Sequence, residues 1–358
     1  MKVGIIGLPK VGKTTVFNAL TGAGAAEFFK GDSKLNLAQV KVPDPRLSRL
    51  GLIYAPKQVV SAEIEFIDIA LPKGTWLEDP EVISHFRQVD ALLEVIRLFP
   101  DQTISPPEGG INPARDIRKI DDELALADLA IIERRITALN HQKGKKKSAQ
   151  DEIEEQLLKR CQEALDAEQP IKMMNLNDEE EKLTRGFQFL TAKSLIIAAN
   201  IAEEALNLTD YPLLNDLRTY TGGKGYPLIV LGGKIEAEVR ELPEEERTEF
   251  LKALGIKEPA IDNLIRTVYS ALGLISFFTI GKKEVKAWTV RTGTPAVKAA
   301  GKIHSDMERG FIRAEVISYE DLISCGSKAT AKSKGLLRLE GKEYQIRDGD
   351  VVEFRFNV

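Results

Sequence analysis

Short, almost continuously apolar runs occur in the first hundred residues and return after residue 193. Each is bounded by glycine, proline or polar residues, which is typical of strands buried on both faces of a parallel sheet. A helical pattern, TTVFNALTG, follows the first run and ends near Gly22. This order of strand, loop and helix predicts an α/β fold. The runs predicted to be strands are 2–6, 59–70, 89–99, 194–200 and 227–233.

Between about Pro113 and Thr191 the apolar positions instead repeat every three or four residues, which predicts helices. The polar and basic stretch NHQKGKKKSAQ divides two such patterns and suits the tip of a helical hairpin. Because the strand pattern resumes at Ser194, we expect the hairpin to be inserted into the α/β domain. The predicted helix seams consist of Leu129, Ile132, Ile136 and Leu139, and of Leu158, Cys161 and Leu165.

After Leu274 the pattern changes to short strand-like pieces joined by tight turns such as RDGD, which predicts a small α+β domain. The sequence therefore predicts four consecutive parts. They are the first part of a nucleotide-binding domain (1–113), an inserted helical domain (114–190), the second part of the nucleotide-binding domain (191–275) and a C-terminal domain (276–358).

Composition narrows the class of protein. The chain has 358 residues, of which 43% are hydrophobic and 29% charged, which is ordinary for a globular protein with more than one core. No apolar run is long enough to cross a membrane, and the N-terminus does not resemble a signal peptide. The chain has two cysteines far apart in the sequence, which does not suggest a disulfide framework. We therefore expect a cytoplasmic protein without a membrane partner.

The charge is unevenly distributed. The net charge is -4, but residues 276–358 contain 15 lysines and arginines against 11 aspartates and glutamates. A basic C-terminal domain on an acidic body hints at a local polyanion partner.

Residues 7–15, GLPKVGKTT, match the phosphate-binding pattern G-x-x-x-x-G-K-[ST]. Gly7 and Gly12 would let backbone N–H groups wrap the phosphates, Lys13 would reach the β and γ phosphates, and the Thr14 hydroxyl would bind Mg²⁺. A chance match is the alternative, but the position between a strand and a helix favours the loop. Lys13 and Thr14 are the expected catalytic residues. The other expected nucleotide contacts in the loop are Lys10, Val11 and Thr15.

Two later strand ends carry further candidates. Asp68 near the end of a strand can hold the water shell of Mg²⁺, or can simply cap the strand. Asn200 follows the strand SLIIAA, and the carboxyl ends of parallel strands face the nucleotide. GTP-binding proteins of this fold carry NKxD here, whereas this chain has Ile201 and Glu203 at the Lys and Asp positions. The longer Glu203 would crowd guanine, although it could also merely cap the following helix.

Together these residues resemble the YchF/Obg-like ATPase family, relatives of the Obg GTPases. The resemblance runs nearly from end to end. The segments that carry it are 7–21, 42–50, 111–129, NIAE at 200–203, 234–255 and 286–317.

The resemblance implies a P-loop NTPase domain with an inserted helical hairpin and a C-terminal β-grasp domain of the TGS type. It also implies that ATP is bound in preference to GTP, that hydrolysis is slow and that the protein associates with ribosomes. In the family the NxxE segment contacts the base, which maps to Asn200, Ile201 and Glu203. Backbone at Gly232 and Gly233 would line the other side of the base.

The sequence departs from the family at the γ-phosphate sensors. Where the family reads DIAGLVKGAS, this chain reads DIALPKGTWLEDPE, so the glycine is lost and Leu71 and Pro72 follow Ala70. The family threonine that completes the Mg²⁺ shell is also absent, and only Asp32 or Ser33 could stand near it. The loop 101–110, with Pro106 and Pro107, lacks the family histidine.

These departures leave three hypotheses open. The first is a slow ATPase that cycles on the ribosome, the second is a binding module that holds nucleotide without hydrolysis, and the third, the weakest, is a small-molecule kinase. We expect a monomer.

An RNA partner would meet the lysines of 143–147 or the basic C-terminal domain, although a lysine run is also typical of a solvated turn. Trp288 fits a core position better than a stacking face, and His304 a structural hydrogen bond better than catalysis. The candidate RNA contacts in the C-terminal domain are Lys282, Lys283, Lys286, Arg309 and Arg313.

Overall fold

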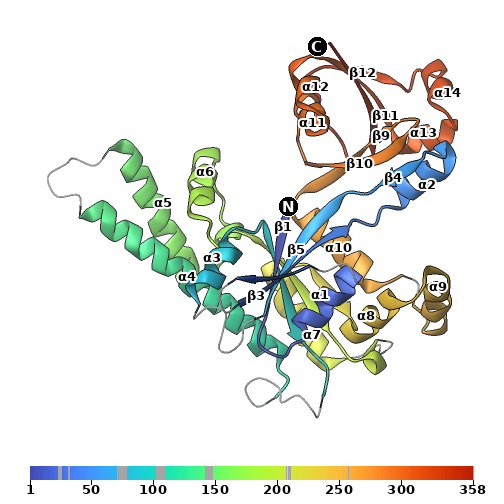
Figure 1. Ribbon diagram of the computed structural model, residues 1–358. Coiled ribbons are helices and arrows are strands. Elements are labelled where there is room, and N and C mark those ends of the chain that lie inside the picture. Colours follow the sequence, from blue (N-terminus) through green and yellow to red (C-terminus); the bar gives the residue numbers. More distant parts are fainter. Residues whose placement is uncertain are drawn as a thin grey trace. The chain divides into compact units, whose positions relative to one another are not determined.

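The chain forms two compact units, each built on its own sheet. A computed structural model describes residues 1–22, 26–30, 33–70, 79–101, 110–141, 148–206, 208, 211–256 and 258–357 (Figure 1). Unit 1 comprises Met1–Ala38 and Glu65–Leu264, and unit 2 comprises Gln39–Ile64 and Ile265–Val358. Residues 39–64 therefore belong to the C-terminal unit. In the sequence, however, this segment connects two strands of the N-terminal sheet.

The sheet of unit 1 contains seven strands in the order β2-β3-β5-β1-β6-β7-β8. Neighbouring strands from β5 to β8 are parallel, and each of the five lies within one of the five predicted apolar runs, whereas β2 and β3 pair antiparallel at one edge. The strands are β1 (Lys2–Ile6), β2 (Ala26–Lys30), β3 (Ser33–Lys41), β5 (Glu63–Ala70), β6 (Ala91–Arg97), β7 (Ser194–Asn200) and β8 (Leu228–Leu231).

The prediction of one strand over 59–70 is wrong. The run is divided into β4 (Gln58–Val60), which pairs with β10 (Glu284–Arg291) in unit 2, and β5 in unit 1. Apolar composition marks both pieces as strands but does not specify which sheet a strand joins, since pairing depends on distant partners.

The helices of unit 1 include the predicted hairpin. Asn112 caps α4, and a capping box of Ser148 and Asp151 begins α5. The predicted seam residues form one apolar cluster, and Arg135 binds Glu154 across the hairpin. The helices are α1 (Lys13–Thr21), α3 (Pro80–Arg87), α4 (Pro113–Asn140), α5 (Ala149–Asp166), α6 (Asp178–Phe187), α7 (Pro212–Lys224), α8 (Gly233–Glu241), α9 (Glu244–Ala253) and α10 (Ala260–Ala271).

The described part of unit 1 also contains the short 3₁₀ turns η4 (Ile171–Met173) and η5 (Glu203–Ala205). Among the helices in the described ranges, none is both long and apolar enough to cross a bilayer.

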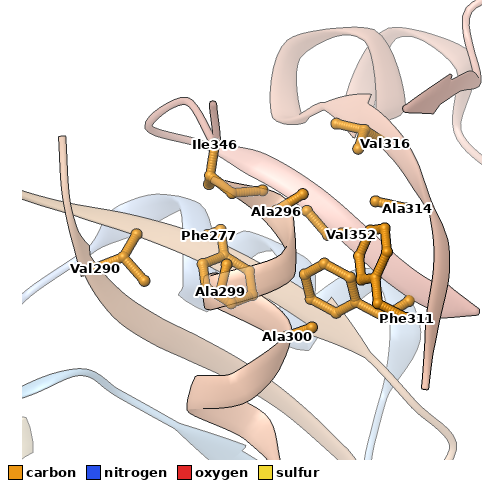
Figure 2. Packing of buried hydrophobic residues seen from close by; sticks show 11 residues of the cluster. Phe277, Val290, Ala296, Ala299, Ala300, Phe311, Ala314, Val316, Ile346 and Val352 are labelled. Carbon is orange, nitrogen blue, oxygen red and sulfur yellow. The ribbon is translucent and has the colours of Figure 1, made fainter. Parts of the chain in front are cut away.

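Unit 2 contains a six-stranded sheet in the order β12-β11-β13-β9-β10-β4. Three alanines of α11, Ala296, Ala299 and Ala300, lie against Phe277 and Phe311 of the sheet, and these small side chains allow close packing (Figure 2). The remaining elements are α2 (Pro45–Tyr54), β9 (Leu274–Ile280), α11 (Ala296–Ile303), α12 (Ser305–Arg309), β11 (Phe311–Ser318), α13 (Tyr319–Cys325), α14 (Lys328–Ser333), β12 (Arg338–Glu340) and β13 (Asp350–Phe356).

Arg46 fixes the segment 39–64 within unit 2. Asp44 caps α2 by accepting the Arg46 N–H at 2.9 Å, and the Arg46 guanidinium donates to Asp44 and to Asp348. The same guanidinium lies 5.3 Å from the ring centre of Phe278. The compact units thus group the chain differently from the four predicted parts, and the boundaries of those parts stay a prediction.

A buried carboxyl group occupies the middle of the sheet in unit 1. Glu94 on β6 is 1% exposed, and its Oε2 has no hydrogen-bond partner among the described residues. Burial, and then the negative charges of Asp121, Asp116 and Glu123, raise the pKa of Glu94 well above its ordinary value of 4.5. The folded protein therefore keeps this carboxyl protonated at pH values where the unfolded chain ionises it.

This difference predicts a pH-dependent stability. Because the pKa is raised in the folded state, the contribution of Glu94 to stability is lost as the pH rises above 4.5. We expect Glu94→Gln to have a higher free energy of unfolding than the wild type at pH 8. The difference between the two proteins should grow as the pH rises, by at most about 1.4 kcal/mol per pH unit. Urea unfolding of both proteins between pH 5 and pH 8 measures this difference in free energy of unfolding. A difference that does not change with pH would contradict the prediction.

Candidate functional site

The loop between β1 and α1 adopts a conformation that depends on its glycines. The φ angles of Gly7 and Gly12 are 139° and 95°, and Lys10 between them has a φ of 65°. A Cβ atom on Gly7 would come within 2.5 Å of the Val95 carbonyl oxygen, and one on Gly12 within 2.3 Å of the Asn200 side chain. The loop therefore needs glycine at both positions, for backbone angle and for space.

Lys13 begins α1 and folds back over the loop. Its Nζ donates to the carbonyl oxygens of Gly7 and Leu8, both at 3.0 Å. Burial lowers the pKa of Lys13, and the nearby charge of Asp68 opposes this shift. An ammonium group has three donors, so the contacts with Gly7 and Leu8 leave it able to bind a phosphate as well.

Three polar side chains meet beside the start of α1. Thr14 Oγ1 donates to Asp68 Oδ2 at 3.1 Å, and Asn36 Nδ2 donates to the same oxygen at 3.2 Å. Burial raises the pKa of Asp68, while hydrogen bonds from Asn36 and Thr14 and the charge of Lys13 lower it. Asp68 Oδ1 is buried and has no hydrogen-bond partner among the described residues. A hydroxyl and a carboxylate oxygen of this kind fit Mg²⁺, which prefers oxygen ligands.

Asn200 links the phosphate-binding loop to the start of α8. Its Nδ2 donates to the Val11 carbonyl oxygen at 3.1 Å, and its Oδ1 accepts the Gly233 N–H at 2.9 Å. The side chain is 4% exposed. The polar atoms of Asn200 therefore hold together the phosphate-binding loop and the backbone at Gly233, which was predicted to line one side of the base.

The other predicted base contacts lie around this link. Ile201 is buried, and its N–H donates to the Leu231 carbonyl oxygen, so it belongs to the connection between β7 and β8. Glu203 is exposed at the first position of η5. Gly232 precedes α8, where a Cβ would come within 2.9 Å of Ile235.

The remaining loop positions are also placed. Lys10 is exposed, Val11 is buried and Thr15 lies half-buried in the first turn of α1. Asp32, Leu71, Pro72, Pro106 and Pro107 lie outside the described residues, as does the lysine run 143–147. Ser33 is the first residue of β3.

Two residues near the loop were not predicted. Asn36 contacts Asp68 from β3, and its signal in the sequence was a polar residue in phase with the buried Ala38 and Val40. Phe99 follows the carboxyl end of β6, and a Cβ on Gly12 would lie 3.9 Å from its ring. The Arg97 guanidinium packs over that ring at 4.6 Å from its centre.

The candidate RNA contacts of unit 2 differ in whether their side chains already contact neighbouring residues. Lys282 and Lys283 are exposed between β9 and β10. The other three contact neighbouring residues of the same unit: Lys286 lies over the ring of Trp288, Arg309 pairs with Asp306 and Arg313 with Glu315.

The interpretations of Trp288 and His304 as structural residues are confirmed. Trp288 packs against the core of unit 2 and donates to Thr279, and His304 Nδ1 accepts the Asp306 N–H to cap α12.

A glycine-dependent loop between a parallel strand and a helix, with Lys13 bonded to the loop and Thr14 bonded to Asp68 beside it, defines the class of P-loop nucleotide-binding proteins. Comparison with known families agrees. Residues 2–132 match a family model described as 50S ribosome-binding GTPase, and residues 274–357 match YchF-GTPase_C, described as Protein of unknown function (DUF933).

Relatives match over the whole chain. The ribosome-binding ATPase YchF of Bacillus subtilis (strain 168) is 43% identical and that of Escherichia coli O157:H7 40% identical, each aligned over 100% of this chain and at least 99% of the relative. The structure of the Schizosaccharomyces pombe YchF GTPase superimposes with a TM-score of 0.87 at 29% identity, covering 99% of this chain and 97% of that one. The chain belongs to the YchF family, and the predicted fold class is confirmed.

The position of Asn200 generates a testable prediction. Asn200→Leu keeps the approximate size but leaves the Val11 carbonyl and the Gly233 N–H unpaired, and each unpaired buried group costs about 1–3 kcal/mol. We expect the free energy of unfolding in urea to fall by about 2–6 kcal/mol. Asn18→Leu on the exposed face of α1 is the control, and equal midpoints for the two variants would refute this role of Asn200.

Proposed function

We propose that this chain binds Mg²⁺ and ATP at the loop 7–15, hydrolyses the nucleotide slowly and associates with ribosomes in the cytoplasm as a monomer. The observation that carries the proposal is the meeting of Lys13, Thr14 and Asp68 beside the glycine loop. The names of the Bacillus subtilis and Escherichia coli relatives, which are ribosome-binding ATPases, support the choice of nucleotide and partner.

Each residue has a chemical role in this proposal. Backbone N–H groups of the loop and the positive end of α1 surround the phosphates, and Lys13 neutralises the charge that develops on them during transfer. Thr14 and Asp68 would hold Mg²⁺, which supplies charge neutralisation when bound. Gly232, Gly233 and the NIAE segment are proposed to surround the base. Glu203, one methylene longer than aspartate, disfavours guanine, so we propose ATP over GTP.

A second candidate function is a module that binds nucleotide without hydrolysing it. The observation that favours it is in the sequence, where Leu71 and Pro72 replace the glycine of the second switch. Pro72 has no N–H group to offer to a γ-phosphate, although Leu71 keeps one.

Single-turnover phosphate release from ATP and GTP, with and without ribosomes, separates the two functions. A working ATPase releases phosphate from ATP well below the roughly 10 per second of an ordinary enzyme, and ribosomes accelerate it. Lys13→Ala should lower the rate at least tenfold by removing a phosphate contact, whereas Lys182→Ala on the exposed face of α6 should leave it unchanged. Tight ATP binding without phosphate release would favour the second function.

We also propose that unit 2 and the lysines of 143–147 contact ribosomal RNA. Within unit 2, Lys282 and Lys283 suit this role best because both are exposed in one tight turn. Lysine contacts with phosphates release counterions, so each contributes to the salt dependence of binding.

Reversing these two charges gives a specific test. We expect Lys282→Glu with Lys283→Glu to weaken co-sedimentation with ribosomes and to reduce the salt dependence by about one unit of slope per lysine. Lys332→Glu with Lys334→Glu changes the net charge equally at exposed positions on and just after α14 and should bind as the wild type does. Equal weakening by both pairs would mean that only the overall charge matters.

A further inference from the structure

Two buried oxygen atoms lie on neighbouring side chains at the edge of the phosphate-binding loop. Asn36 is 6% exposed and Asp68 is 0% exposed. Neither Asn36 Oδ1 nor Asp68 Oδ1 has a hydrogen-bond partner in the part of the chain that the structure describes. A buried acceptor without a partner destabilises the folded protein, so two such atoms on adjacent side chains point to a ligand that binds both.

The hydrogen bonds around Asp68 orient both oxygens. Thr14 and Asn36 donate to the same carboxylate oxygen, Oδ2, at 3.1 and 3.2 Å. The carboxylate therefore has its second oxygen free of these donors. Since the amide nitrogen of Asn36 is used in the contact with Asp68, its oxygen is the atom left to meet a ligand.

The chemistry of these atoms selects a cation. A carboxylate oxygen and an amide oxygen are acceptors only, and with the threonine hydroxyl they form a set of hard oxygen donors, which suits Mg²⁺. Within the described ranges no group of three His, Cys, Asp or Glu side chains is placed to hold a metal. A magnesium ion here would thus depend on neutral oxygens and on the phosphates of a nucleotide, as Mg²⁺ sites in nucleotide-binding proteins commonly do.

We propose that the amide oxygen of Asn36 holds the nucleotide-bound Mg²⁺, either directly or through one of its waters, together with Thr14 and Asp68. The proposal rests on the proposed function of the site. Asn36 would then contribute to magnesium binding in a chain that lacks the family threonine of the first switch. The residue comes from the strand β3, on the same face as the buried Ala38 and Val40, rather than from a loop.

The alternative role for Asn36 is purely structural, as a donor that holds the Asp68 carboxylate. Two substitutions separate the roles. Asn36→Leu removes both polar atoms, whereas Asn36→Asp removes the donor but keeps an oxygen that can face a cation. Gln39→Leu is the matched control because Gln39 is an exposed amide side chain on the same strand.

The measurement is the affinity for a fluorescent ATP analogue, titrated once with Mg²⁺ and once with EDTA. The ratio of the two affinities is the magnesium gain of each variant. We expect Asn36→Leu to reduce this gain at least tenfold while its affinity in EDTA stays within twofold of the wild type. Asn36→Asp should keep most of the gain, and Gln39→Leu all of it. Thermal unfolding in EDTA confirms that each variant is folded.

The outcomes are distinct. A full magnesium gain in Asn36→Leu overturns the inference, and so does an equal loss of gain in Asn36→Leu and Asn36→Asp, which is the result expected for a structural donor. Failure of the wild type to bind the analogue at all would instead overturn the proposed function.

Discussion

The close approach of Gly12 to the Asn200 side chain is the constraint on which the rest of the site depends. A Cβ at Gly12 would lie 2.3 Å from Asn200 Nδ2, so the contact exists only with glycine. Through it the amide of Asn200 reaches Val11 on one side and Gly233 on the other. One buried side chain thus joins the phosphate-binding loop, the end of β7 and the start of α8, which come from distant parts of the sequence.

The polar groups of the site leave one positive and one negative charge available to ligands. Lys13 suits a phosphate, and Asp68 suits a cation. Lys13 is held over the loop by backbone carbonyl oxygens, while Asp68 receives neutral donors and, within the described ranges, no direct ion pair. A firm Lys13–Asp68 ion pair would oppose the binding of both ligands, because each charge would already be neutralised. The observed arrangement keeps the ammonium and the carboxylate near one another but available.

The chain passes between the two compact units three times, and two of the passages lie within β3 and β5. These are the strands that carry Asn36 and Asp68. The segment between them, 39–64, is secured in unit 2 by the pairing of β4 with β10 and by the contacts of Arg46 with Asp44 and Asp348. The edge of the nucleotide site is therefore covalently continuous with the C-terminal unit along two strands.

The sequence by itself determined the elements whose signals are local. The strand 2–6, the glycine loop and the helix that follows lie within about twenty residues, and the loop needs glycine for backbone angles that few other residues adopt. The helix seams of the hairpin and the strands of unit 2 were likewise predictable, because periodicity reports burial within one element.

Only the tertiary structure decided which distant residues meet. Asn36 reaches Asp68 across 32 positions and Asn200 reaches Val11 across 189, and no local pattern specifies either contact. The same limit explains why residues 59 and 60 were assigned to the wrong sheet and why Phe99 was overlooked as a neighbour of the loop. Local propensity sets what an element is, whereas its neighbours are selected by packing of the whole chain, which long-range contacts determine.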